Sequence, residues 1–273
     1  MEISIKNLSY VEKKSSSEKK YLKDINVDIN KGTITGFLGD KITILGKLLN
    51  LEKKPSNGEI KINNISIKKN TKVSVYSELR KKIGFLKEEN DYLFTETTVK
   101  EFIENILSKK GFKSNVKKRV LDSLRIVGLN DSYIDRNPNK LSYIEKKKIL
   151  LASILSYNPD IIILENFNNG LSFREKESYK KLLLKLKNKL SKTIILLGND
   201  VSFYFDLVDK LLVINNTNLV YEGNNKSFYE NELYNYVEMP KIVEFTNYVN
   251  DKGHSILQYI DFKELIKEIY RKV

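Results

Sequence analysis

The chain has 273 residues, of which 41% are hydrophobic, so it can bury a sizeable core as one two-lobed domain with an appendage or as two modest domains. It contains no cysteine, which excludes a disulfide framework and a thiolate zinc site, and its single histidine, His254, has no second imidazole with which to form a metal or catalytic site.

The formal net charge of +13 is of a sign that suits nucleic acid or anionic lipid. The lysines are spread over almost every polar segment, however, and no aromatic-basic RNA-binding motif accompanies them, so we expect no nucleic-acid partner. The N-terminus lacks the apolar core of a signal peptide, and apolar runs such as 149–155 are shorter than the ~18 residues that span a bilayer. We therefore expect a cytoplasmic protein that meets a membrane only through a partner or at its surface.

The first ninety residues alternate between strand and helix patterns. Five apolar or alternating runs predict strands, at 1–5, 22–29, 33–38, 59–62 and 83–86. A Lys- and Ser-rich segment at 12–20 predicts a polar loop between the first two strands. Gly39 follows the third strand directly, and leucines at 45, 48, 49 and 51 predict a helix after it.

From about residue 97 the pattern becomes helical. Thr98 with Glu101, and Ser142 with Glu145, have the spacing of capping boxes and predict two helix starts, with another helix over 116–127 between them. Apolar strands follow at 161–164 and 193–197, separated by a helix that Ser172 and Glu175 cap.

A hairpin across 215–218 is followed, from about Glu238, by two short helices, the second capped by Asp261 and Glu264. Strands that alternate with helices predict a largely parallel sheet covered on both faces. The fold class expected from the pattern alone is therefore α/β.

Several short motifs occur in order along the chain: Asn7-Leu-Ser-Tyr10, Gly36-Phe-Leu-Gly39, Asn137-Pro-Asn-Lys-Leu-Ser142, Ile161-Ile-Ile-Leu-Glu165 and Gly170-Leu171. With the order of elements, they resemble the ATP-binding subunits of ATP-binding-cassette (ABC) transporters. Asp91-Tyr-Leu-Phe94, Met239-Pro240, Gly253 and Phe262-Lys-Glu-Leu265 are similar to the energy-coupling-factor branch.

The resemblance implies a P-loop-NTPase-like nucleotide-binding domain at 1–235, in which a mostly parallel sheet is joined by an antiparallel β part. It also implies a helical subdomain at about 97–157 and a small α-rich appendage at 236–273.

The segment after Gly39 departs from the family's phosphate loop. That loop reads G-x-x-x-x-G-K-[ST], because backbone N–H groups surround the phosphates, Lys neutralises their charge and the hydroxyl binds magnesium. Aligned from the end of the following helix, this chain is about three residues short, so Ile42 falls at the lysine position and Thr43 at the hydroxyl position. We predict an ordinary strand-to-helix turn with Thr43 as the helix N-cap.

A shifted alignment does not restore the motif. If Gly46-Lys47 were the glycine and lysine, Leu48 would replace the magnesium ligand. Asp40 also brings negative charge to the place of the phosphates. Gly39, Lys41 and Thr43 remain as the candidate nucleotide contacts of this segment, with Thr43 a weak metal candidate.

Other positions that the resemblance assigns to chemistry are also replaced. Glu12 stands where an aromatic stacks on adenine, and Glu88 matches the glutamine that senses magnesium. Glu165, the second weak metal candidate, replaces the magnesium-binding aspartate. Asn166 replaces the glutamate that polarises water, and Asn199 replaces the switch histidine. Since an amide cannot act as a general base, no catalytic residue is intact.

The signature motif of the family, Leu-Ser-Gly-Gly-Gln, reads here Leu141-Ser142-Tyr143-Ile144-Glu145. Ser142 is kept as a candidate nucleotide contact, but two bulky side chains replace the glycines that approach the partner's γ-phosphate. The Ser142 and Glu145 pair is explained by helix capping alone.

Intact apolar periodicity with a replaced site predicts a pseudo-ATPase. No cofactor is expected, and ATP with Mg²⁺ only if the altered site still binds them. The resemblance implies a head-to-tail dimer with an intact ATPase paralogue, or with itself, docked on a membrane coupling subunit at the inner face of the cell membrane. The segment 87–92 would meet that subunit or form a solvated loop.

Three alternatives stay open. A regulatory or scaffolding protein, or a diverging copy, would occupy the place of a cassette without supporting turnover. An unusual active ATPase would use Lys41 or Lys47 with Glu165, and its turnover would depend on magnesium. Nucleic-acid binding by the basic surface would show a steep dependence on salt.

Overall fold

The computed structural model of the chain describes residues 3–14, 17–88, 94–204, 207–224, 227–228, 241–256 and 262–272. The strands are β1 Ile3–Lys14, β2 Ser17–Ile29, β3 Ile34–Gly39, β4 Asn57–Ile62, β5 Ile65–Ile67, β6 Ile83–Leu86, β7 Ile161–Glu165, β8 Thr193–Leu197, β9 Lys210–Asn215 and β10 Asn218–Gly223. The α-helices are α1 Ile42–Leu49, α2 Val73–Lys81, α3 Val99–Lys109, α4 Val116–Ile126, α5 Tyr143–Ser156, α6 Phe173–Leu190, α7 Val201–Tyr204, α9 Lys241–Asp251 and α10 Phe262–Lys272. Short 3-10 turns lie at Asp131–Tyr133 and Pro138–Lys140.

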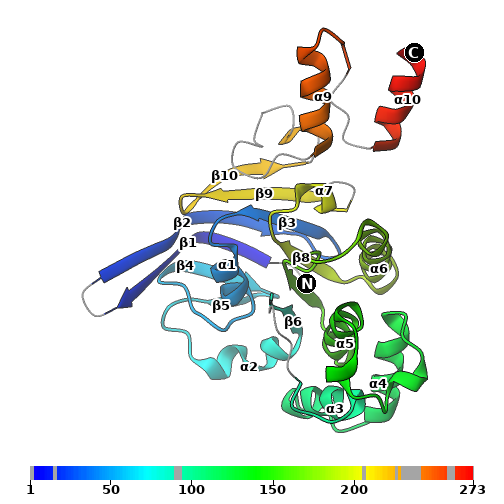
Figure 1. The fold of residues 1–273 in the computed structure, drawn as a ribbon. Helices are drawn as coiled ribbons and strands as arrows, with labels where there is room; N and C mark the ends of the chain where they lie inside the picture. The colour runs from blue at the N-terminus through cyan, green and yellow to red at the C-terminus, as the bar shows by residue number, and fades with distance from the viewer. Residues whose placement is uncertain are drawn as a thin grey trace.

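The strands form two sheets (Figure 1). A four-stranded antiparallel sheet has the order β2-β1-β4-β5, and a six-stranded sheet has the order β10-β9-β3-β8-β7-β6. In the second sheet every neighbouring pair is parallel except β9 with β10. The prediction of an α/β fold with a mostly parallel sheet and an antiparallel β part is confirmed.

Alternation along the buried strands gives each face of the six-stranded sheet its own core. One face contributes Ile162, Leu164, Ile194 and Leu196 to a core that it shares with α3, α4, α5 and α6. The other contributes Ile161, Ile163, Ile195 and Leu197 to a core that it shares with α1 and the antiparallel sheet. A strand buried on both faces reads as a continuous apolar run, which is how β7 and β8 read in the sequence.

The predicted polar loop at 12–20 is wrong. β1 continues to Lys14 and β2 begins at Ser17, so this segment is the end of a long hairpin. Glu12 pairs across the strands with Lys19, and Lys13 pairs with Glu18. The Glu12 carboxylate accepts from Lys53 Nζ and from the Tyr10 hydroxyl, and a search for apolar periodicity misses a strand end that is rich in charged residues.

The three predicted capping boxes are present. Thr98, Ser142 and Ser172 each accept a hydrogen bond from the backbone N–H three residues on, and the glutamate there bonds back to the cap residue. The sequence pattern missed β5 and α2. α2 buries only Tyr76 and Leu79, which is too few apolar residues to mark a helix by periodicity.

The appendage contains α9 and α10, and it lies at the opposite end of the molecule from α2, α3 and α4 (Figure 1). Asp261, which was predicted to cap α10, and the motifs at 91–93 and 239–240 lie outside the described residues. Within the described part of the chain, no helix combines the length and apolar character that crossing a bilayer requires.

Gly84 allows α5 to pack closely against β6. A Cβ at this position would lie 2.2 Å from Ile154 Cγ2, and a β-branched side chain has little rotamer freedom with which to move away. We expect Gly84→Ala to destabilise the fold by about 1–3 kcal/mol, although alanine is intrinsically better than glycine in a strand.

The measurement is the free energy of unfolding in urea for the four members of a double-mutant cycle. In an Ile154→Ala background, Gly84→Ala should cost clearly less, because the clashing methyl group is gone. Equal costs in both backgrounds would show that this contact is not the cause.

Candidate functional site

Only Asp40 and Lys41 separate β3 from α1, at the place where a phosphate loop would stand. Gly39 has φ of 103°, and a Cβ there would lie 1.9 Å from the carbonyl oxygen of Ile214, so only glycine fits beside β9. The Gly39 N–H donates to Asn199 Oδ1 at 2.8 Å, and the Asp40 N–H donates to the Ile214 carbonyl at 3.0 Å. Two backbone donors at the end of β3 are therefore used within the protein.

The prediction that Thr43 is the helix N-cap is wrong. The N-cap is Lys41, whose φ is 62°, and no side chain caps α1. Thr43 lies exposed in the first turn. The helix begins two residues earlier than a Thr43 cap would allow, and Ile42 and Ile44 are both buried in the core beneath.

The charges in this connection are arranged against a phosphate. Lys41 Nζ pairs with Asp40 Oδ2 at 2.9 Å, so this lysine is engaged by its neighbour. Asp40 Oδ1 is buried and has no hydrogen-bond partner among the described residues. A carboxylate in this position repels a phosphate group, whereas a phosphate loop presents free N–H donors and a free lysine.

Lys47, the other lysine that an active site could use, lies at the end of α1 that does not favour a phosphate. Lys47 lies in the last turn of α1, away from the N-terminal end where the helix dipole favours an anion. Gly46 is buried within the helix, and a Cβ there would meet Leu197 Cδ1 at 2.7 Å and Phe85 Cζ at 2.9 Å. The packing of α1 on the sheet therefore explains why position 46 is a glycine.

Glu88, just after β6, is the centre of a polar cluster at the carboxyl ends of the parallel strands. Asn166 Nδ2 donates to one of its carboxylate oxygens at 2.5 Å, and Asn169 Nδ2 donates to the other at 2.7 Å. The Glu88 N–H lies 3.4 Å from Glu165 Oε2, and Glu165 is only 5% exposed. Both carboxylate oxygens of Glu88, the residue that matches the magnesium-sensing glutamine, are therefore hydrogen-bonded to amides of the protein.

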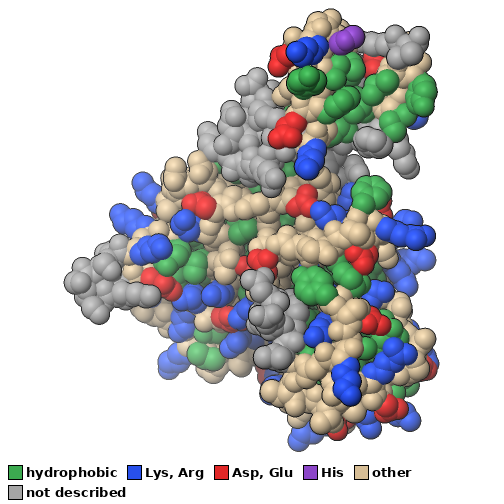
Figure 2. Space-filling view, viewed as in Figure 1, with side chains coloured by type: hydrophobic (Ala, Val, Ile, Leu, Met, Phe, Trp, Pro, Cys, Tyr) green, Lys and Arg blue, Asp and Glu red, His purple; other side chains and the backbone are tan. Residues whose placement is uncertain are grey.

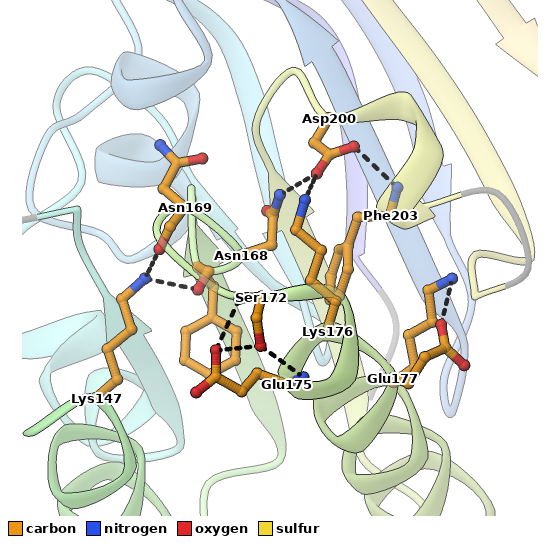
Figure 3. A network of polar contacts seen from close by, with 11 residues as sticks. Lys147, Asn168, Asn169, Ser172, Glu175, Lys176, Glu177, Asp200 and Phe203 are labelled. Carbon is orange, nitrogen blue, oxygen red and sulfur yellow. Dashed lines mark hydrogen bonds and ion pairs between the residues drawn. The ribbon is translucent and has the colours of Figure 1, made fainter. Parts of the chain in front are cut away.

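A second cluster follows β8 (Figure 3). Asp200 Oδ2 accepts from Asn168 Nδ2 at 2.7 Å and pairs with Lys176 Nζ at 2.6 Å, while Oδ1 accepts from the Phe203 N–H at 3.0 Å. This carboxylate therefore connects the loop after β7, the helix α6 and the start of α7.

Ser142 lies at the N-terminus of α5, where it serves the helix. Its Oγ donates to Glu145 Oε2 at 2.7 Å and accepts from the Glu145 N–H. Hydrogen bonds from Tyr133 and Ser142 lower the pKa of Glu145 to about 2. The next residue, Tyr143, is 40% exposed, and its hydroxyl donates to the Asn169 carbonyl at 3.3 Å.

Lys147 is a buried cation that the sequence did not indicate. It is 3% exposed, and its Nζ donates to the carbonyl oxygens of Phe167, at 2.9 Å, and Asn169 (Figure 3). Burial lowers its pKa to about 8, and the Glu88 carboxylate opposes that shift in part. Lys147 lies between Lys146 and Lys148, and a run of three lysines is typical of a solvated helix face. No local feature of the sequence therefore distinguishes the buried Lys147 from its neighbours.

The structure brings together some of the predicted site residues and not others. Glu88, Glu165 and Asn166 meet in one cluster, and Gly39 meets Asn199. Lys41 contacts Asp40 and Ser142 contacts Glu145, each within its own segment. In the described part of the chain, no group of three His, Asp or Glu side chains is arranged to hold a metal ion.

A groove of about 330 Å³ lies between the sheet edge and the helices. It is lined by Asn50, Glu52, Ile83, Phe85, Leu86, Lys87, Phe102, Ile106, Lys110, Leu150, Ser153, Ile154 and Tyr157. The walls come from β6 and the end of α1 on one side and from α3 and α5 on the other. Its floor is apolar, while Lys87 pairs with Glu52 across its rim at 2.9 Å.

Comparisons with known families, curated proteins and solved structures all match proteins of ABC transporters. The ABC transporter family model matches residues 22–168. A putative ABC transporter ATP-binding protein of Pyrococcus horikoshii is 32% identical over 257 residues, which cover 92% of this chain and 94% of the relative. The energy-coupling factor transporter ATP-binding protein EcfA2 of Streptococcus thermophilus is 29% identical, with 93% and 94% covered.

Among solved structures, cbiO1 of Clostridium perfringens, part of the ABC transporter complex cbiONQ, superposes with a TM-score of 0.74 at 24% identity. The superposition covers 90% of this chain and 94% of that one. The likeness shows that the two chains share a fold.

Lys147 should make stability depend on pH in a measurable way. Its pKa is about 8 in the folded protein and about 10.4 in an unfolded chain. Between these values the unfolded state binds more protons, so the free energy of unfolding should rise with pH in this window.

The measurement is the unfolding free energy of wild type minus that of Lys147→Met at pH 7, 8, 9 and 10, which removes the contributions of other titrating groups. The difference should be constant near pH 7 and should increase above pH 8. A difference independent of pH would contradict the burial of a titrating ammonium here.

Proposed function

Because the chain belongs to the ABC transporter family, we propose that it is a cassette subunit that does not turn over ATP and that pairs with an intact cassette in an importer of the energy-coupling-factor type. The observation that carries the proposal is the two-residue connection after β3, in which the Gly39 and Asp40 N–H groups already have acceptors and a carboxylate stands in the place of the phosphates. The similarity to EcfA2 supports the type of importer.

The chemistry at the ends of β6 and β7 supports the same proposal. ATP hydrolysis in a cassette needs a carboxylate that positions and activates water and a cradle that neutralises the phosphates. Asn166 has no acid-base capacity at neutral pH, and its amide is bonded to Glu88. The residues at this site therefore do not fit Mg²⁺ and ATP, and we assign them no catalytic step.

A second candidate function is favoured by Tyr143. In a head-to-tail pair, each composite site takes a phosphate loop from one chain and a signature motif from the other. Tyr143 lies over Gly170 and bonds to the Asn169 carbonyl, at the place where signature glycines would approach the partner's nucleotide. A chain that spoils both composite sites would act as a regulatory or scaffolding subunit rather than as half of a working pair.

The groove between β6 and α3 supports docking on a membrane subunit. Its apolar floor and charged rim have the chemistry that accepts an amphipathic helix. We propose that this groove receives a coupling helix of the membrane subunit, which would hold the chain peripherally at the inner face of the membrane.

The first test is equilibrium binding of a fluorescent ATP analogue, with and without Mg²⁺, against an intact ABC cassette as the positive control. We expect a Kd no tighter than about 1 mM, which corresponds to roughly −4 kcal/mol. Magnesium-dependent micromolar binding that Lys41→Ala or Lys47→Ala abolishes would instead indicate the active-ATPase alternative.

The docking proposal is tested by Ile106→Glu, which places a charge in the wall of the groove. We expect this variant to lose co-purification with an energy-coupling-factor membrane subunit from the same genome, because a buried charge without a partner opposes an apolar interface. The matched control is Val220→Glu, at an exposed position on β10 outside the groove. Retained co-purification of Ile106→Glu would contradict docking at this groove.

A further inference from the structure

The N-terminal half of α2 and the turn before it form an exposed surface of lysines and valines, which we call the α2 patch: Lys68, Lys69, Lys72, Val73 and Val75. The two valines are 54% and 51% exposed and lie in the first turn of α2, one on each flank of the buried side that carries Tyr76 and Leu79. Figure 2 shows hydrophobic side chains in the region of α2 with Lys and Arg side chains beside them. Large apolar side chains this exposed stand out on a segment that is otherwise polar.

The charge of this segment is strongly positive. Residues 68–82 contain six Lys or Arg residues and one acidic residue, Glu78, which pairs with Lys81 at 2.7 Å. Lys68 lies 3.5 Å from Glu59 and is 65% exposed. Lys69 and Lys72 form no ion pair with any residue that the structure describes, and the first turn of α2 has no acidic residue. The N-terminal end of α2 therefore presents the positive charges of Lys69 and Lys72 together with two exposed valines.

The C-terminal end of α2 is hydrogen-bonded to a residue that lines the groove. Lys110 Nζ donates to the Arg80 carbonyl at 2.9 Å and to the Ile83 carbonyl at 3.3 Å, and Lys110 and Ile83 both line the groove. A nine-residue helix rises about 12 Å from its first residue to its last. The patch thus lies about one helix length from the groove, and on the opposite side of the molecule from the appendage (Figure 1).

We propose that the α2 patch binds the surface of an anionic lipid bilayer. The lysines would pair with headgroup phosphates, as basic segments beside a membrane do, and the two valines, both in the first turn of α2, would enter the headgroup region with this end of the helix. Single-stranded nucleic acid is disfavoured as the occupant, because such surfaces stack bases on exposed aromatic rings and Tyr76, the aromatic of α2, is buried. The inference rests on the proposed function to the extent that docking at the groove turns this side toward the membrane.

The test is sedimentation of the purified full-length chain with vesicles, without nucleotide and without any membrane subunit. Vesicles of phosphatidylcholine alone are compared with vesicles containing phosphatidylglycerol, at low and high salt. We expect at least tenfold stronger partitioning onto the anionic vesicles, falling as salt screens the lysines. Each lysine near an anionic surface contributes about fivefold, so Lys69→Glu with Lys72→Glu should reduce partitioning at least tenfold.

The matched control is Lys185→Glu with Lys189→Glu, two exposed lysines of α6, which changes the net charge by the same amount. This control should retain most of the binding, whereas Val73→Ser with Val75→Ser should lose roughly fivefold, on the scale of two small apolar groups. Melting temperatures near that of wild type confirm that these surface variants fold.

Several outcomes would overturn the inference: equal loss in the patch variant and the α6 control, equal binding to both kinds of vesicle, or loss of RNA-homopolymer binding without loss of vesicle binding. Failure of vesicle binding while Ile106→Glu still loses the membrane subunit would reject the α2 patch alone. Vesicle binding as expected, with no effect of Ile106→Glu, would reject docking at the groove.

Discussion

The short connection between β3 and α1 is the constraint on which the rest of the site depends. β3 lies in the middle of the six-stranded sheet, and α1 is packed between the two sheets, so the two ends that the connection joins are fixed in place. Asp40 and Lys41 alone join them, and Gly39 is pressed against the carbonyl of Ile214. A cradle for phosphates needs several free N–H groups around an open loop, and the two residues between β3 and α1 are too few to form one.

The polar side chains near this connection are hydrogen-bonded to other groups of the protein. Glu88 accepts from Asn166 and Asn169, Asp200 bonds to Asn168 and Lys176, and Lys147 donates to two carbonyls of the same loop. Partly buried polar groups are costly when unpaired, and the amides of Asn166, Asn168 and Asn169 are each satisfied by a neighbouring carboxylate. The hydrogen bonds after β7 therefore stabilise one arrangement of α5, α6 and the sheet.

If turnover is absent, the role of the chain resides in its surfaces. The groove lined by β6, α3 and α5 and the α2 patch lie near one another, connected by the hydrogen bonds of Lys110 to Arg80 and Ile83. In our proposals the groove receives a helix of a membrane subunit and the α2 patch contacts the lipid around it. The proximity of Lys69 and Lys72 to the two exposed valines is local in the sequence, and the fold decides only that these side chains are exposed.

The sequence by itself determined the features that depend on neighbours a few residues apart. The capping boxes at Thr98, Ser142 and Ser172, the buried strands β7 and β8 and the identities of Asn166 and Asn199 are all readable locally, since helix caps and strand periodicity involve short separations. Tertiary structure alone decided the rest. Glu88 and Asn166 are 78 positions apart, α1 begins at Ile42, whose side chain is buried in the core, and Glu12 lies in a strand paired with β2 and bonds to Lys53, 41 positions away. Lys147 is buried because the loop after β7 folds over it. Such contacts form only when distant segments pack together, and no short window of sequence contains both partners.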